Sequence, residues 1–279
     1  MTEMSVLEYL RYPFVRHALA AGTLVALCSS LLGVTLVLRR FSLLGDGLSH
    51  VAFGALAIAA ALHLTMPIPF VMLATAVAAV LLLAGGARSR IRGDASTAVL
   101  SVGALAVGYM LLNIFKGSPN VAGDVCSTLF GSASILTLDR GDVWMCGAVS
   151  AATAALYAWF HDRVFAVTFD EDFARVGGLS ARSCNFAVAL TTAVVVTMAM
   201  RLVGALLASA LIVFPALTAM RLFGGYRAVV LASVATATVG AASGIIASLA
   251  FETPVGPTVV TVNMVMYAAA CAIGRWRGR

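Results

Sequence analysis

We predict an all-α fold, a polytopic bundle of eight or nine transmembrane helices that forms one transmembrane domain over residues 1–279. Two observations support it: the composition and a series of long apolar runs. The 279-residue chain is 61% hydrophobic and 11% charged, with a mean hydropathy of +1.01. Soluble domains are typically about 45–50% apolar and about 25% charged. The composition therefore excludes a disordered chain, a coiled coil, a nucleic-acid-binding module and an ordinary soluble enzyme.

Nine apolar runs follow one another along the chain, and a membrane-spanning helix needs roughly 20 such residues. They cover residues 18–38, 48–64, 70–87, 97–114, 143–160, 186–200, 202–220, 229–251 and 259–273. Backbone groups in lipid must be paired within the segment, which favours helices, and the runs lack the alternation of barrel strands. Arg201 joins two of the runs without a turn, so eight and nine spans both remain open.

The charges predict the orientation of these helices. The net charge is +6, but we attribute it to loop topology rather than to nucleic-acid binding. If the N-terminus lies outside and nine helices follow, 13 of the 18 basic residues fall in inside connections, as the positive-inside rule requires. Those residues are Arg39, Arg40, Arg88, Arg90, Arg92, Arg163, Arg175, Arg182, Arg221, Arg227, Arg275, Arg277 and Arg279.

Three connections are too polar or too patterned to be plain turns: residues 39–50, 116–137 and 161–185. The apolar part of the second is too short to span a bilayer, so we expect a re-entrant or surface helix there. The third is the longest inside loop. Within it, residues 169–179 predict a short helix that starts at Asp170, Glu171 and Asp172 and ends at Gly177 and Gly178. Docking to a partner protein and a solvated surface turn are both open interpretations.

Asp46 and His50 are the first candidates for chemistry, since four residues of helix place them on one face. Ionisable residues at membrane depth are costly and face a bundle interior or a water-filled path. Carboxylate and imidazole together suit Zn²⁺, Mn²⁺ or Fe²⁺. Two ligands are too few for a closed site, but a two-fold homodimer would supply four. The alternative is that Asp46 caps its helix and His50 lies at the membrane interface.

The remaining signals are weaker. We expect His17 and His63 at helix ends and His161 in solvent, and Gly240 with Gly244 forms a GxxxG pattern that suits close helix packing. A phosphate-binding loop needs GxxxxGK[ST], yet the single lysine, Lys116, follows Phe115. We therefore expect no enzyme activity in this chain, and any ATP-driven transport would require a separate ATPase.

Four blocks of sequence carry a family resemblance. LRRFSLLGDGLSHVAFGALA, DVCSTLFGSASILT, MRLVGALLASALIVFPALTAMRLF and FETPVGPTVV follow in order over nearly the whole chain. The sequence resembles the membrane permeases of the ABC-3 family, the transmembrane subunits of zinc, manganese and iron ABC importers.

The resemblance implies a type II ABC importer-like permease in the bacterial inner membrane, working as a homodimer with two cytoplasmic ATPase subunits. It implies an extracytoplasmic metal-binding protein as a further partner, and a divalent metal ion as cargo rather than as a permanently bound cofactor. Asp46 and His50 would contact that metal in transit. FDEDFARVGGL would be the coupling helix that meets the ATPase, with Asp170, Asp172, Phe173, Ala174, Gly177 and Gly178 in its pattern.

Two other functions are open at this stage. An ion-coupled secondary metal transporter would need acids or histidines in the middle of several spans, and apart from Asp46 and His50 the spans hold almost none. A membrane scaffold that transports nothing would need neither the Asp46 and His50 pair nor an ordered docking helix on the inside.

Overall fold

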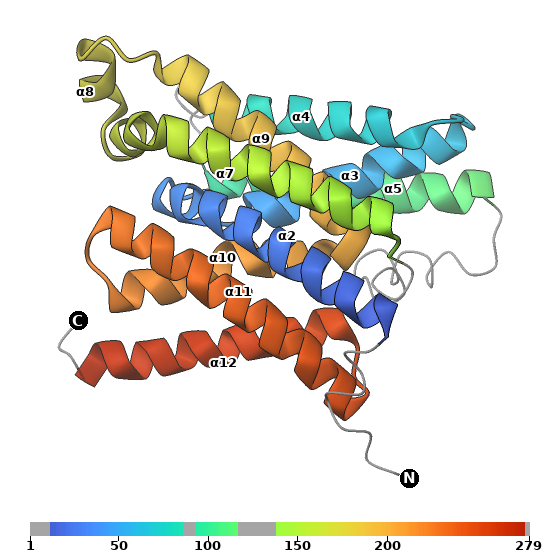
Figure 1. Ribbon diagram of the computed structural model, residues 1–279. Coiled ribbons are helices and arrows are strands. Elements are labelled where there is room, and N and C mark those ends of the chain that lie inside the picture. The colour runs from blue at the N-terminus through green and yellow to red at the C-terminus, as the bar shows by residue number, and fades with distance from the viewer. Residues whose placement is uncertain (1–11, 86–92, 117–137, 277–279) are drawn as a thin grey trace.

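The computed structural model describes residues 12–85, 93–116 and 138–276, and 89% of these residues are helical with no strand among them (Figure 1). The helices are α2 (Pro13–Leu38), α3 (Leu44–Ala61), α4 (Pro67–Gly85), α5 (Asp94–Lys116), α7 (Arg140–Phe169), α8 (Glu171–Val176), α9 (Ala181–Val203), α10 (Ala205–Leu222), α11 (Tyr226–Phe251) and α12 (Val255–Trp276). Eight of them are long and apolar enough to cross a membrane, and α4 contributes a shorter apolar stretch, Pro67–Leu83. The predicted all-α transmembrane bundle is confirmed.

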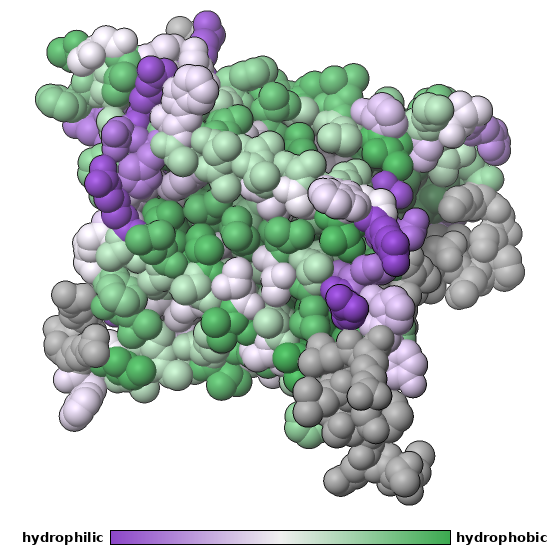
Figure 2. Space-filling view, viewed as in Figure 1, coloured by the Kyte–Doolittle hydropathy of each residue, from purple (hydrophilic) through white to green (hydrophobic). Residues whose placement is uncertain are grey.

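Helix α2 forms the centre of the bundle, in contact with α7, α9, α10 and α11. Of its most apolar window, 72% is buried, against 17% for α5. Large apolar side chains such as Val99 and Trp159 are exposed on the outer helices. Apolar residues cover the middle of the visible face and polar residues gather towards its two ends (Figure 2). This distribution is the one expected of a protein surrounded by lipid.

The two ends of the bundle differ in charge. Helix α8, the turn between α2 and α3 and the end of α12 lie at one end, and the α3–α4 and α11–α12 connections lie at the other (Figure 1). Helix positions assign eight described arginines to the first end, here called the arginine-rich end: Arg39, Arg40, Arg163, Arg175, Arg182, Arg221, Arg227 and Arg275. Only Arg16, Arg140 and Arg201 belong to the helix ends opposite.

The junction between α9 and α10 differs from the sequence prediction. The apolar runs on either side of Arg201 left the number of spans open, but Arg201 lies inside α9, which ends at Val203 with Gly204 as its C-cap. Gly204 has φ 96° and ψ 156°, a conformation that a residue with a Cβ rarely adopts. The chain therefore turns at this glycine, three positions after Arg201.

The start of the predicted long inside loop is also wrong, because α7 continues through residues 161–169. His161 is part of this helix, and its ring centroid lies 5.4 Å from that of Tyr226 on α11. Phe165 and Phe169 pack on the same tyrosine at 5.0 and 6.0 Å, and the hydroxyls of Tyr157 and Tyr226 are 2.7 Å apart. These tertiary contacts keep the last turns of α7 helical. Of the 116–137 connection, Lys116 ends α5; the surface or re-entrant helix expected there lies outside the described residues.

The GxxxG prediction on α11 is confirmed by the packing of α11 on α12. A Cβ atom at Gly244 would lie 2.6 Å from Val259 Cα, and one at Gly240 would lie 2.6 Å from Asn263 Oδ1. Real Cβ atoms do not approach so closely, so these two glycines allow the α11 backbone to contact the backbone of Val259 and the side chain of Asn263 on α12. The absence of side chains at these two positions sets the separation of α11 and α12.

Replacement of Gly244 by leucine should therefore destabilise the protein. Overpacking of a close contact costs roughly 1–3 kcal/mol, which we expect to appear as a melting temperature several degrees lower for the purified protein in detergent. Gly147→Leu on α7 is the matched control, since a Cβ there meets no atom within 4 Å. Equal melting temperatures for the two variants would contradict this account of the packing.

Candidate functional site

Asp46 and His50 lie together in the first two turns of α3, as the spacing predicts. His50 Nε2 is 3.5 Å from Asp46 Oδ2, and the side chains are 15% and 46% exposed, respectively. That separation is longer than an ordinary N–H···O hydrogen bond, which spans about 2.7–3.2 Å. Two donor atoms bound to one tetrahedral ion at roughly 2.1 Å are about 3.4 Å apart. The distance fits an ion pair along the helix and equally fits two ligands on a single ion.

The rest of the described chain adds no further ligand to this pair. No group of three or more His, Cys, Asp or Glu side chains that could hold a metal occurs in residues 12–85, 93–116 and 138–276. His17 Nδ1 lies 3.3 Å from the Leu138 carbonyl oxygen, His63 is exposed between α3 and α4, and His161 belongs to the aromatic cluster on Tyr226. One copy of the chain therefore offers two ligands at this place.

The second nitrogen of His50 has no hydrogen-bond partner among the described residues. Nδ1 is buried and makes no hydrogen bond in the described structure. An unpaired buried polar atom costs roughly 1–3 kcal/mol. The described residues therefore offer this nitrogen nothing that offsets its burial.

The alternative interpretation, in which Asp46 caps α3, does not match the hydrogen bonds at the start of this helix. The N-cap residue is Leu43, and its N–H donates to Asp94 Oδ1 over 2.9 Å. Asp94 is the first residue of α5, and its second oxygen accepts a hydrogen bond of 2.8 Å from Ser42 Oγ. A carboxylate from another helix thus caps α3, and Asp46 is left to pair with His50. Sequence reasoning missed this contact, since it joins residues 51 apart.

The predicted coupling segment forms α8, which projects at the arginine-rich end (Figure 1). Asp170 is its N-cap and accepts a 2.9 Å hydrogen bond from the Phe173 N–H. Ala174 is buried, while Phe173 and Val176 are 74% and 88% exposed. Gly177 is the C-cap and Gly178 follows with φ +81°. The helix is therefore anchored by its alanine and presents an unpartnered apolar face.

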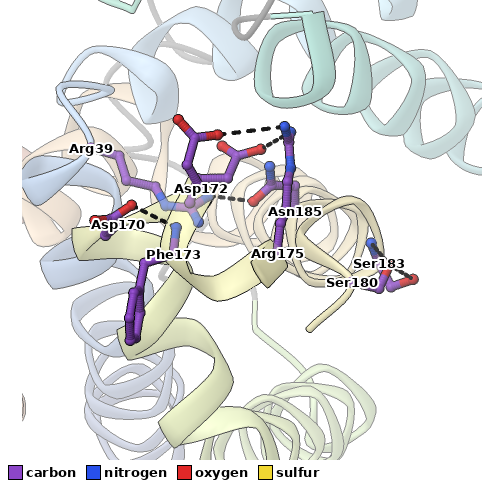
Figure 3. Close-up of polar contacts among 9 residues, drawn as sticks. Arg39, Asp170, Asp172, Phe173, Arg175, Ser180, Ser183 and Asn185 are labelled. Carbon is purple, nitrogen blue, oxygen red and sulfur yellow. Dashed lines mark hydrogen bonds and ion pairs between the residues drawn. The ribbon is translucent and has the colours of Figure 1, made fainter. Parts of the chain in front are cut away.

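Charged side chains surround this short helix. Arg175 pairs with Glu171 one turn earlier and lies 3.7 Å from Asp172, whose side chain is fully open to solvent (Figure 3). Arg39, which ends α2, donates a 2.7 Å hydrogen bond to Asn185 Oδ1 on α9. Burial lowers the pKa of the Arg39 guanidinium, and the negative charge of Glu171 acts in the opposite direction. Arg39 and Glu171 line a common cavity of about 630 Å³.

Comparison with known proteins identifies the family. Residues 11–274 match the model of the ABC 3 transport family. The chain belongs to this family. The permease is 25% identical to the manganese transport system membrane protein MntC of Halalkalibacterium halodurans, over 94% of its own length and 88% of the relative's. It is also 25% identical to the high-affinity zinc uptake system membrane protein ZnuB of Haemophilus influenzae, over 90% and 94% of the two chains.

A solved structure has the same fold. The permease superposes on a chain of PsaBC from Streptococcus pneumoniae, solved in complex with Fab, with a TM-score of 0.80, 22% identity and coverage of 95% and 94% of the two chains. The predicted family membership and the permease fold are confirmed, and the permease is a multi-pass protein of the bacterial plasma membrane. The roles predicted for Asp46, His50 and the residues of α8 stay predictions. Of the four sequence blocks, DVCSTLFGSASILT lies outside the described residues.

Loss of the α8 cap should loosen this helix without affecting the bundle. Replacement of an N-cap aspartate by alanine costs roughly 0.5–2 kcal/mol, so Asp170→Ala should speed amide hydrogen exchange across residues 171–176. Asp172→Ala is the control, because an exposed ion pair contributes little. Unchanged exchange in Asp170→Ala would show that packing of Ala174 alone holds the helix.

Proposed function

We propose that the permease is the transmembrane subunit of an ATP-binding cassette importer that moves a divalent transition metal ion, zinc, manganese or iron, across the bacterial inner membrane. The observation that carries this proposal is the Asp46 and His50 pair on α3, with two donor atoms 3.5 Å apart in a chain of the ABC 3 transport family. Manganese and zinc appear in the names of the relatives described above.

The pair suits transit rather than storage. Each chain offers one carboxylate and one imidazole, so a homodimer with its two-fold axis beside α3 would surround the ion with four ligands. Such a site replaces part of the ion's water shell, yet conduction requires binding weak enough for release. The buried, unpartnered Nδ1 of His50 supports a functional reason for this residue.

Energy would come from a separate subunit. The sequence has no GxxxxGK[ST] loop, so the permease would not bind ATP through this motif. The exposed Phe173 and Val176 of α8 give a cytoplasmic ATPase a small apolar surface to bind. An extracytoplasmic metal-binding protein would deliver the ion at the opposite end. An ion-coupled secondary transporter is not favoured, because the chain belongs to an ABC transport family.

Substitution of both ligands should abolish metal uptake. Asp46→Ala with His50→Ala removes every ligand that one chain is proposed to supply, so cells that depend on this transporter should lose metal-dependent growth. Membrane expression and basal ATPase activity should remain, since neither side chain is fully buried. His63→Ala, an exposed histidine between α3 and α4, serves as the control. Uptake at the wild-type level in the double variant would refute the assignment.

Phe173 should anchor the ATPase. Truncation of a hot-spot residue in an interface costs about 2 kcal/mol or more, so Phe173→Ala should weaken co-purification with the ATPase subunit by at least roughly tenfold. Phe251→Ala provides the comparison, because this phenylalanine is equally exposed but ends α11 at the opposite end. Undiminished ATPase recovery with Phe173→Ala, or an equal loss with both variants, would argue against α8 as the docking helix.

A further inference from the structure

We propose that Asp94 is a positioning residue for the Asp46 and His50 pair, a role that rests on the proposed function. Asp94 is not among the ligands. It belongs to α5, yet both of its carboxylate oxygens bind the turn from which α3 starts. It thereby fixes the position of the helical turn that carries Asp46.

Asp94 caps α3 through two hydrogen bonds. Asp94 Oδ1 accepts from the Leu43 N–H at 2.9 Å and Oδ2 accepts from Ser42 Oγ at 2.8 Å. In a capping box, a side chain at the third helical position binds the N–H of the N-cap residue. The third position of α3 is Asp46, which instead pairs with His50. Asp94 performs the capping function from outside and leaves Asp46 available for a ligand.

The turn between α2 and α3 and the residue before α5 also contact each other through their backbones. Gly93 has φ +64°, and a Cβ there would lie 2.6 Å from the Arg40 carbonyl oxygen. Arg40 also has a positive φ, of 60°. The turn between α2 and α3 is thus pressed against the residue that precedes Asp94. Movement of the turn away from α5 would break both hydrogen bonds of the carboxylate.

Close packing against α5 also fixes the rotation of α3 about its own axis. A Cβ at Gly47 would lie 2.5 Å from Thr97 Cγ2, and one at Gly54 would lie 2.8 Å from the Ala104 carbonyl oxygen. Helix α3 therefore packs tightly along α5 over two turns beyond the cap. Because Gly47 is the neighbour of Asp46, this packing fixes the side of α3 on which the carboxylate lies. The glycines fix the rotation of α3 about its own axis, and Asp94 keeps the first turn of α3 helical.

The location of Asp94 connects the cap of α3 with the proposed docking helix α8. Asp94 lines the same cavity of about 630 Å³ as Arg39 and Glu171, the latter on α8. This cavity thus connects Asp94, which binds the turn that leads into α3, with Glu171 of the proposed ATPase-docking helix. A residue in this position that contacts no metal is expected to act on metal affinity rather than on the assembly of the transporter.

The test uses the purified permease–ATPase complex in lipid nanodiscs and in vesicles, with Co²⁺ as the probe. Groups that orient metal ligands typically change affinity by 10–100-fold when removed. Asp94→Ala should therefore raise the KM for Co²⁺ uptake roughly tenfold with Vmax little changed, and should alter the d–d absorption of bound Co²⁺. Ser42→Ala, which removes one of the two hydrogen bonds, should act in the same direction but less strongly and keeps the test valid if Asp94→Ala does not fold.

A conservative variant of Asp94 distinguishes a role in positioning the pair from a general effect on the stability of the protein. Asp94→Asn keeps an oxygen for the Leu43 N–H and an amide that can donate to Ser42 Oγ, so its KM and Co²⁺ spectrum should be close to wild type. Asp139→Ala removes a cap from α7 at the opposite end and should leave both readouts unchanged. A wild-type KM and spectrum in Asp94→Ala, or an equal effect of Asp139→Ala, would overturn the proposal.

One further variant separates this proposal from the one before it. If Asp46→Asn abolishes Co²⁺ uptake while Asp94→Ala leaves KM and spectrum unchanged, only the role of Asp94 is refuted. If Asp46→Asn transports Co²⁺ like the wild type, the proposed metal pair is refuted, and the role of Asp94 with it.

Discussion

The need to pair every backbone N–H and C=O inside the protein governs this structure, because lipid offers no hydrogen-bonding partner. The described chain meets it with long helices joined by short connections. Once the backbone is paired, the helices have no hydrophobic drive to associate in lipid and depend on close contact. Small residues provide that contact: Gly33 of α2 lies against the Ile212 carbonyl of α10, and Gly244 lies against Val259. The buried position of α2 follows from this packing.

Charged groups are expensive in such an environment, which makes their distribution informative. Most of the described arginines belong to one end of the bundle, and acids such as Asp170 and Asp139 cap helices. The pair of Asp46 and His50 is different, since it lies on α3, which packs closely along α5, and one ring nitrogen of His50 has no partner within the described part of the chain. It is this pair for which we propose a role in binding the cargo.

The proposed docking and metal-binding elements are connected through one short turn. Arg39 joins the end of α2 to α9 through Asn185, Asp94 joins the start of α3 to α5, and the cavity between them reaches Glu171 on α8. The aromatic cluster around Tyr226 meanwhile holds the last turns of α7, from which α8 continues. The helix proposed to meet the ATPase thus shares one cavity, at the arginine-rich end, with the turn that leads into α3 and with Asp94.

The sequence by itself determined the class of fold, the positions of most spans, the charge asymmetry, the α8 segment and the spacing of Asp46 and His50. Each of these depends on local composition or helical periodicity, which a single stretch of chain contains. The tertiary structure alone decided the break at Gly204, the extension of α7 to Phe169 and the cap that Asp94 gives to α3. The last two depend on contacts between residues distant in the sequence, and the break depends on a backbone angle that many glycines in the chain could have adopted.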